Sequence, residues 1–125
     1  MAFSRTVCYT VGMETRYVVY MLSCADGSLY TGVTVDLARR FLAHHDRTKA
    51  GAKYTHGFGA VAVAAAWQAA DKTAAYRLEY YIKRLTRAQK CALIETDDFA
   101  ALSRRGVDAA AYVRIPDVML PVPSI

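Results

Sequence analysis

Two short apolar runs flank an Ala-Asp-Gly-Ser turn between residues 17 and 34, and this pattern predicts a β-hairpin. Each predicted strand carries a tyrosine, Tyr20 on the first and Tyr30 on the second. A two-residue Asp-Gly turn would place the two rings on opposite faces of the hairpin. A three-residue loop that ends with Gly27 in the left-handed conformation would place both rings on one face.

The next two segments predict a helix and a third strand. Apolar and basic residues alternate at helical spacing over 36–45, and Thr34 or Asp36 is placed to cap that helix. Residues 60–69 contain two valines and a tryptophan at positions that suit a strand, although their many alanines also fit a helix. We interpret this segment as a strand.

The strongest helical pattern covers 73–85, and Asp71 or Thr73 can open it. A further helix is expected over 87–95, after a break near Thr86. The element order is then β-β-α-β-α-α. This order predicts an α+β domain in which helices pack against an antiparallel sheet.

Length and composition narrow the class of protein. A chain of 125 residues with 54% apolar and 22% charged residues is typical of one globular domain. It contains no apolar run of about 20 residues and no secretory signal pattern, so we expect no membrane association. Three cysteines without CxxC spacing, of which Cys24 and Cys91 fall in buried-type patterns, favour a reducing, cytoplasmic location.

The net charge of +5 is concentrated in one part of the chain. Residues 16–95 contain twelve Lys and Arg against six Asp and Glu. Lys and Arg release counterions from phosphates, so a basic domain of this kind suits a polyanion such as nucleic acid.

Two helix faces carry the candidate chemistry. Arg40 and His44 are four residues apart and share a face, which is either a solvated surface or a phosphate-contacting one. Glu79 shares a face of the later helix with Lys83 and is surrounded by basic residues. That carboxylate is either an ion-pair partner or a ligand for a hard divalent cation such as Mg²⁺, which uses one or two carboxylates and keeps several waters.

The candidate residues together suit phosphodiester cleavage. The chain has no Ser or Cys nucleophile beside a base, no carboxylate pair and no P-loop, and we expect no nicotinamide or flavin cofactor. A metal ion on the carboxylate would neutralise phosphate charge, an arginine would stabilise the transition state, and a tyrosine or histidine would accept a proton from water. The set is Tyr20, Tyr30, Arg40, His44 and Glu79, with Lys53 in a Gly-rich loop.

These residues lie in motifs that resemble those of the GIY-YIG nuclease superfamily, specifically its small stand-alone bacterial branch. The first triplet reads Val18-Val19-Tyr20 and keeps only the tyrosine of the signature, and the second reads Tyr30-Thr31-Gly32. The segment TVDLARRFLAHH resembles T-x-D-L-x-x-R-x-x-x-H, GAKYT resembles a loop of the small branch, and LEYYIKRLTRAQKCALI resembles the helix with the metal-binding glutamate.

The resemblance covers residues 16–95 and implies a three-stranded antiparallel sheet flanked by helices. It implies endonuclease activity that depends on Mg²⁺ or Mn²⁺ bound at Glu79, with the two tyrosines flanking the site and one of them acting as general base. Arg40 would orient water or stabilise phosphate, and His44 completes the set. Residues 1–15 and 96–125 match nothing and are interpreted as an N-terminal extension and a C-terminal extension of unknown role.

Sequence-specific members of the superfamily usually carry a separate DNA-recognition domain, and we expect no room for one here. The resemblance therefore favours single-stranded or branched DNA as the substrate and suggests DNA repair or recombination. DNA is favoured, and RNA stays open because nothing in the sequence reads or rejects a 2′-hydroxyl. Exposed tyrosines could stack on unpaired bases, with Tyr80 and Tyr81 among the candidates.

The alternatives to a nuclease are a non-catalytic nucleic-acid-binding module and a structural interaction protein; oligomeric state is not predicted. The expected nucleic-acid contacts are Arg39, Lys53, Tyr54, Lys83 and Arg84.

Overall fold

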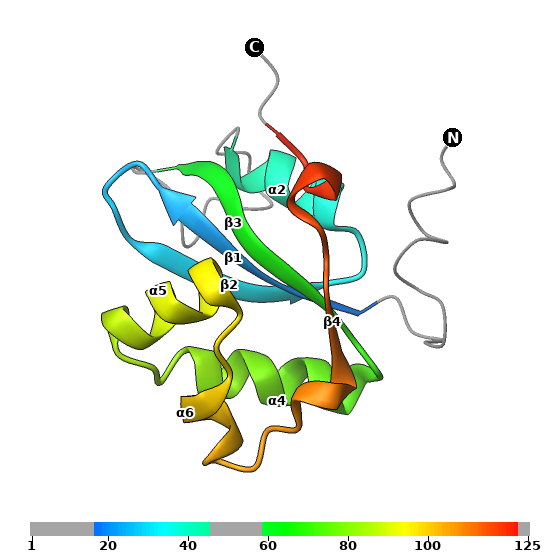
Figure 1. The fold of residues 1–125 in the computed structure, drawn as a ribbon. Coiled ribbons are helices and arrows are strands. Elements are labelled where there is room, and N and C mark those ends of the chain that lie inside the picture. Colours follow the sequence, from blue (N-terminus) through cyan, green and yellow to red (C-terminus); the bar gives the residue numbers. More distant parts are fainter. Residues whose placement is uncertain (1–16, 46–58, 123–125) are drawn as a thin grey trace.

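A computed structural model describes residues 17–45 and 59–122, with the side chains of 44 and 45 left out (Figure 1). Four strands form one sheet, and helices lie on both of its faces. The elements are β1 (Val18–Cys24), β2 (Leu29–Thr34), α2 (Leu37–His45), β3 (Ala60–Ala69), α4 (Lys72–Ile82), α5 (Arg87–Thr96), α6 (Ala100–Ser103), the 3-10 turn η1 (Ala109–Ala111), β4 (Tyr112–Arg114) and the 3-10 turn η2 (Asp117–Met119).

The sheet has the strand order β2-β1-β3-β4, and all of its neighbours are antiparallel. The three predicted strands and the α+β class are therefore confirmed. The prediction of only three strands is wrong, because Tyr112–Arg114 adds a short edge strand whose residues pair with Trp67, Gln68 and Ala69. This strand lies in the region to which the sequence assigned no role.

The hairpin uses the three-residue loop. Gly27 has a φ of 86°, its N–H donates to the Cys24 carbonyl at 2.9 Å, and the Cys24 N–H donates to the Ser28 carbonyl at 3.0 Å. Tyr20 consequently lies opposite Gly32 in the register of β1 and β2. Residues separated by two along a strand share a face, so this register brings both tyrosines to the same side of the sheet.

The helix boundaries follow capping residues. Asp36 accepts a hydrogen bond from the Arg39 N–H at the start of α2, and Asp71 accepts one from the Ala74 N–H at the start of α4. Thr86 and Gln89 form a reciprocal capping box that starts α5. Helix α4 ends at Ile82, three residues before its predicted end, because a tight turn follows it.

Two apolar cores lie on the two faces of the sheet. Helices α4, α5 and α6 pack on one face, around the buried side chains of Trp67, Leu78 and Leu93 (Figure 1). Helix α2 and the C-terminal η2 turn pack on the other face, where Tyr20 and Phe41 are fully buried. Strand β1 has no solvent-exposed side, because its side chains are buried on both faces of the sheet.

Residues 97–115 are held to the domain by side-chain contacts as well as by β4. The Trp67 indole N–H donates to Asp97 at 2.8 Å, and the Arg114 guanidinium contacts the same carboxylate at 3.2 Å. Arg114 also donates to the Ile94 carbonyl at 2.8 Å, at the end of α5. The indole, carboxylate and guanidinium groups thereby join β3, α5 and β4.

Two further sequence predictions concern cysteines and membranes. Cys24 is buried as expected, Cys91 is only half-buried, and both are free thiols, while Cys8 lies outside the described residues. Within the described parts of the chain, no helix combines the length and the apolar character needed to cross a bilayer.

Candidate nuclease site at the β1–β2 hairpin

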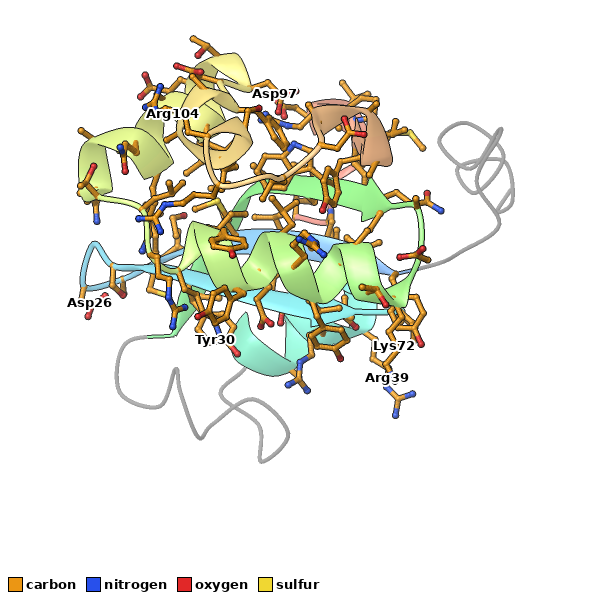
Figure 2. All side chains as sticks on the ribbon, turned by 90° about the horizontal axis from the view of Figure 1, so that it is seen from below. Asp26, Tyr30, Arg39, Lys72, Asp97 and Arg104 are labelled. Atoms are coloured by element: carbon orange, nitrogen blue, oxygen red, sulfur yellow. The ribbon has the colours of Figure 1, made fainter. Side chains whose placement is uncertain are left out.

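The two signature tyrosines form a ring pair on one face of the hairpin. Their ring centroids are 6.3 Å apart and their planes are inclined by 45°. Tyr20 is 1% exposed, whereas Tyr30 is half-buried on the edge strand β2. Figure 2 shows the Tyr30 side chain at this sheet edge, between α4 and α2. Of the two arrangements that the sequence allowed, the structure therefore has the one with both tyrosines on the same face.

Gly32 makes room for the Tyr20 ring. A β-carbon at position 32 would come within 2.5 Å of the Tyr20 hydroxyl oxygen and 2.7 Å of the ring carbon that bears it. Contacts this short do not occur, so any side chain at position 32 would displace the ring. Gly32 was not among the residues predicted to form the site, although a glycine inside a strand often marks such a close approach.

Arg40 connects α2 to the tyrosines. Its side chain forms a hydrogen bond with Tyr20, which places a cationic group at the phenol. Burial raises the pKa of Tyr20 to about 12, and the Arg40 hydrogen bond and charge oppose that rise. The Tyr20 hydroxyl is therefore a neutral proton donor at physiological pH unless further positive charge approaches it.

Glu79 extends the cluster from the other face of the sheet. It lies on α4 and is close enough to raise the pKa of Tyr20 through its negative charge, as Tyr30 also does. Its carboxylate forms an ion pair with Lys83 at 3.3 Å, and its side chain is 20% exposed. The structure thus places Tyr30 and Arg40 against Tyr20, and Glu79 lies near enough for its charge to act on Tyr20.

The donor set around Glu79 suits a hard, water-rich cation. A single carboxylate that is 20% exposed, and so open to water, matches the few protein ligands and the retained waters that Mg²⁺ accepts. A closed structural zinc site would need about four nitrogen or sulfur ligands. No group of three or more His, Cys, Asp or Glu residues that could hold an ion occurs among the residues that the structure describes.

The remaining predicted site residues are only partly described. Arg39 is exposed on α2, and Lys83 and Arg84 are exposed just after α4. Arg84 lies over the Tyr80 ring at 3.6 Å, so Tyr80 is an exposed aromatic group with a cation stacked on it. Tyr81 is half-buried against the core. The His44 side chain, Lys53 and Tyr54 lie outside the described residues.

Comparison with known sequences agrees with this geometry. The profile of the GIY-YIG catalytic domain matches residues 16–92. The UPF0213 protein YhbQ of Salmonella typhimurium is 44% identical over 89 residues, which cover 70% of this chain and 87% of that protein. The UPF0213 protein BH0048 of Halalkalibacterium halodurans is 44% identical over 79 residues, which cover 63% of this chain and 82% of that protein.

A solved structure is also similar in sequence. The solution NMR structure of the UPF0213 protein BH0048 from Bacillus halodurans is 43% identical, covers 62% of this chain and 81% of its own, and has a TM-score of 0.38. Because the domain profile spans more than half of the chain and close relatives match along most of their own length, the chain belongs to the GIY-YIG family, in the branch of the small UPF0213 proteins.

Proposed function

We propose that the protein is a divalent-metal-dependent endonuclease that hydrolyses phosphodiester bonds in DNA, with single-stranded or branched DNA as its substrate. The observation that carries this proposal is the Tyr20 hydroxyl, which is hydrogen-bonded to Arg40 and lies in the field of both Tyr30 and Glu79. An acid–base group, a fixed cation and a carboxylate are the components that phosphodiester hydrolysis requires.

In the proposed reaction, water attacks phosphorus and the bond from phosphorus to the leaving oxygen breaks. Tyr20 is our candidate for the group that accepts the proton of this water, because the Arg40 guanidinium stabilises its phenolate form. Arg40 also supplies positive charge where the transition state gains negative charge. Tyr30, which is half-buried at the sheet edge, orients the water or the phosphate beside Tyr20.

The residues present fit a bound Mg²⁺ or Mn²⁺, with Glu79 as its protein ligand. When bound, the ion supplies charge that neutralises the phosphate and favours ionised oxygen groups near it. The Glu79–Lys83 ion pair competes only weakly with metal binding by Glu79, because an i,i+4 pair on a helix stabilises by only about 0.3–0.5 kcal/mol. Arriving phosphate can then take Lys83 as its own partner.

The substrate class follows from the surface around the cluster. The cations Arg39, Lys83 and Arg84 are exposed on α2 and after α4, and Tyr80 offers an exposed ring. Basic side chains interleaved with aromatic rings suit a flexible strand whose unpaired bases can stack. This favours single-stranded and branched DNA over continuous duplex, and DNA repair or recombination as the setting.

The direct test is cleavage of labelled DNA by purified protein. Single-stranded, duplex and branched substrates are incubated with Mg²⁺, with Mn²⁺ or with a chelator, beside the variants Glu79→Gln and Arg77→Gln. We expect metal-dependent cleavage of single-stranded or branched DNA that Glu79→Gln abolishes. Arg77→Gln, which changes an exposed cation on α4, serves as the surface control and should cleave normally.

Two outcomes would contradict the proposal. Binding of DNA without cleavage under every metal condition would indicate a non-catalytic nucleic-acid-binding module instead. Cleavage that persists unchanged in Glu79→Gln would exclude this carboxylate from the mechanism and would indicate a contaminating nuclease.

A further inference from the structure

A concave surface lies outside the tyrosine cluster. It is a cleft of about 190 Å³ between the end of α4, the start of α5 and the α6 region. This volume is far larger than the roughly 10–15 Å³ that a single buried water needs. Tyr81 and Leu102 form part of its apolar lining, and its polar lining consists of Arg84, Gln89, Arg104 and Arg105.

The charge of this cleft is entirely positive. Three of its lining side chains are arginines, and none is acidic. Within the described residues, neither Arg104 nor Arg105 forms an ion pair or a side-chain hydrogen bond, and both are exposed. Guanidinium groups gathered without a carboxylate repel each other, so an anion that bridges them gains favourable interactions with all of them.

Arg84 is already ordered at the mouth of this cleft. Its guanidinium stacks on the Tyr80 ring at 3.6 Å and donates to the Tyr80 carbonyl at 3.1 Å. A side chain that is held in place before binding loses less conformational freedom when an anion arrives. Gln89 adds an amide donor, so the lining offers several N–H groups to the oxygens of one phosphate.

The cleft lies within reach of a strand bound at the tyrosine cluster. Figure 2 shows Arg104 and Tyr30 toward the same end of α4, on opposite sides of that helix. Glu79 lies in the last turn of α4, and Lys83 and Arg84 follow directly after the helix ends at Ile82. Lys83 and Arg84 therefore provide cations between Glu79 and the cleft.

We propose that this arginine cleft binds a backbone phosphate of the nucleic-acid strand, outside the catalytic cluster. The inference rests on the proposed nuclease function and deepens it by adding a second contact to the substrate. Arg104 and Arg105 lie beyond residues 16–92, which the GIY-YIG domain profile matches. The C-terminal segment thus supplies a substrate contact that the family domain does not contain.

The test measures binding without cleavage. All variants are made in a Glu79→Gln background and assayed in chelator, with fluorescent single strands of about three and about 20 nucleotides, chosen below and above the site sizes of single-strand binders. The double variant Arg104→Gln/Arg105→Gln is compared with Arg77→Gln, the same substitution at an exposed cation in the first half of α4. A second double variant, Arg104→Lys/Arg105→Lys, keeps the charge.

We expect Arg104→Gln/Arg105→Gln to weaken binding of the long strand about tenfold and to leave the short strand unaffected. The slope of log Kd against log salt should fall by about 0.7, because this is the contribution of one single-strand phosphate that the protein no longer neutralises. The lysine variant should restore most of this slope. Arg77→Gln should change neither quantity appreciably.

An unchanged affinity for the long strand would overturn the proposal. An equal loss of affinity for the short strand would also overturn it. So would a loss of affinity per removed charge in Arg77→Gln equal to that in the cleft variants, because either result would indicate a general effect of net charge. The cleavage assay reports separately: if wild-type protein cuts no DNA while the cleft variants lose binding as expected, the nuclease proposal fails and the cleft proposal stands.

Discussion

The hydroxyl of Tyr20 on β1 lies directly against the backbone of Gly32 on β2, in the space that a side chain at position 32 would occupy. The glycine of the second signature triplet therefore accommodates the tyrosine of the first. Because Tyr20 is only 1% exposed, its ring has no free volume into which it could move.

Gly32→Ala should consequently damage both stability and activity. We expect a loss of about 1–3 kcal/mol in the free energy of unfolding from overpacking. We also expect a fall of about 100-fold in kcat/KM, since a shift of about 1 Å in a catalytic group can have that effect. Urea denaturation and a cleavage assay measure the two quantities.

A double-mutant cycle supplies the control for Gly32→Ala. Tyr20→Ala removes the ring atoms that the new β-carbon would meet, so Gly32→Ala should destabilise the protein much less in that background. If the two substitutions were additive, the close approach of Tyr20 to Gly32 would not be the cause of the loss.

The raised pKa of Tyr20 makes stability depend on alkaline pH. The pKa of Tyr20 is about 12 in the folded protein, above its ordinary value of 10.0, so the folded state retains a proton that the unfolded chain loses. Folding stability should then decrease as pH rises above about 10, by about 1.4 kcal/mol between pH 8 and pH 11 from this group alone. Urea denaturation of wild type and Tyr20→Phe at both pH values isolates the contribution, which the variant should lack.

Activity should depend on pH in the opposite direction. A general base with a high pKa is scarce in its ionised form at neutral pH, so kcat/KM should rise about tenfold per pH unit across the mildly alkaline range. Tyr20→Phe should lower kcat/KM by about 100-fold or more and remove this slope. Tyr30→Phe is the matched control, and loss of the slope there instead would transfer the role of general base to Tyr30.

The local features of the fold were predictable because neighbouring residues encode them. Asp71 and Thr86 mark the starts of α4 and α5, and the sequence narrowed the hairpin loop to two types, of which the structure has the one that pairs Tyr20 with Gly32. The shared face of the tyrosines follows from this register alone. Arg40 contacts Tyr20 and the Glu79 charge acts on it, and the catalytic roles that the family resemblance implies for both stay predictions.

The long-range features were not predictable in the same way. Strand β4 has only three residues, too few for a periodic pattern, and it forms because Trp67 and Ala69, more than forty positions earlier, offer an open edge. The arginine cleft requires α6 to pack beside the end of α4, and the pair Arg104–Arg105 carries no signal for that packing.

The Glu79–Lys83 ion pair should compete weakly with metal binding. Its 3.3 Å contact lies on a partly exposed helix face, where such a pair contributes about 0.3–0.5 kcal/mol, so Lys83→Met should tighten Mn²⁺ binding about twofold. Titration of free protein with Mn²⁺ by electron paramagnetic resonance measures this without nucleic acid. Lys90→Met is the control for loss of one charge and should leave the Kd unchanged, whereas Glu79→Gln should abolish the site.

The Asp97 carboxylate should contribute strongly to stability through Trp67. Asp97 accepts the indole N–H at 2.8 Å, contacts Arg114 at 3.2 Å and adopts a left-handed conformation with a φ of 56°. Asp97→Ala would leave the buried indole N–H without its acceptor and would put alanine, which tolerates the left-handed conformation less well than aspartate, at this position. We expect a loss of about 2–4 kcal/mol in the free energy of unfolding, measured by urea denaturation.

Two matched variants separate the contributions of Asp97. Asp97→Asn keeps an acceptor oxygen and tolerates the left-handed conformation, so it should lose less than about 1 kcal/mol, the value of a partly exposed ion pair. Asp97→Gly relieves the backbone but removes the acceptor, so its loss should lie between those of the other two variants. Equal losses for Asn and Ala would instead assign the effect to the charge on Asp97, and the indole hydrogen bond would then contribute little.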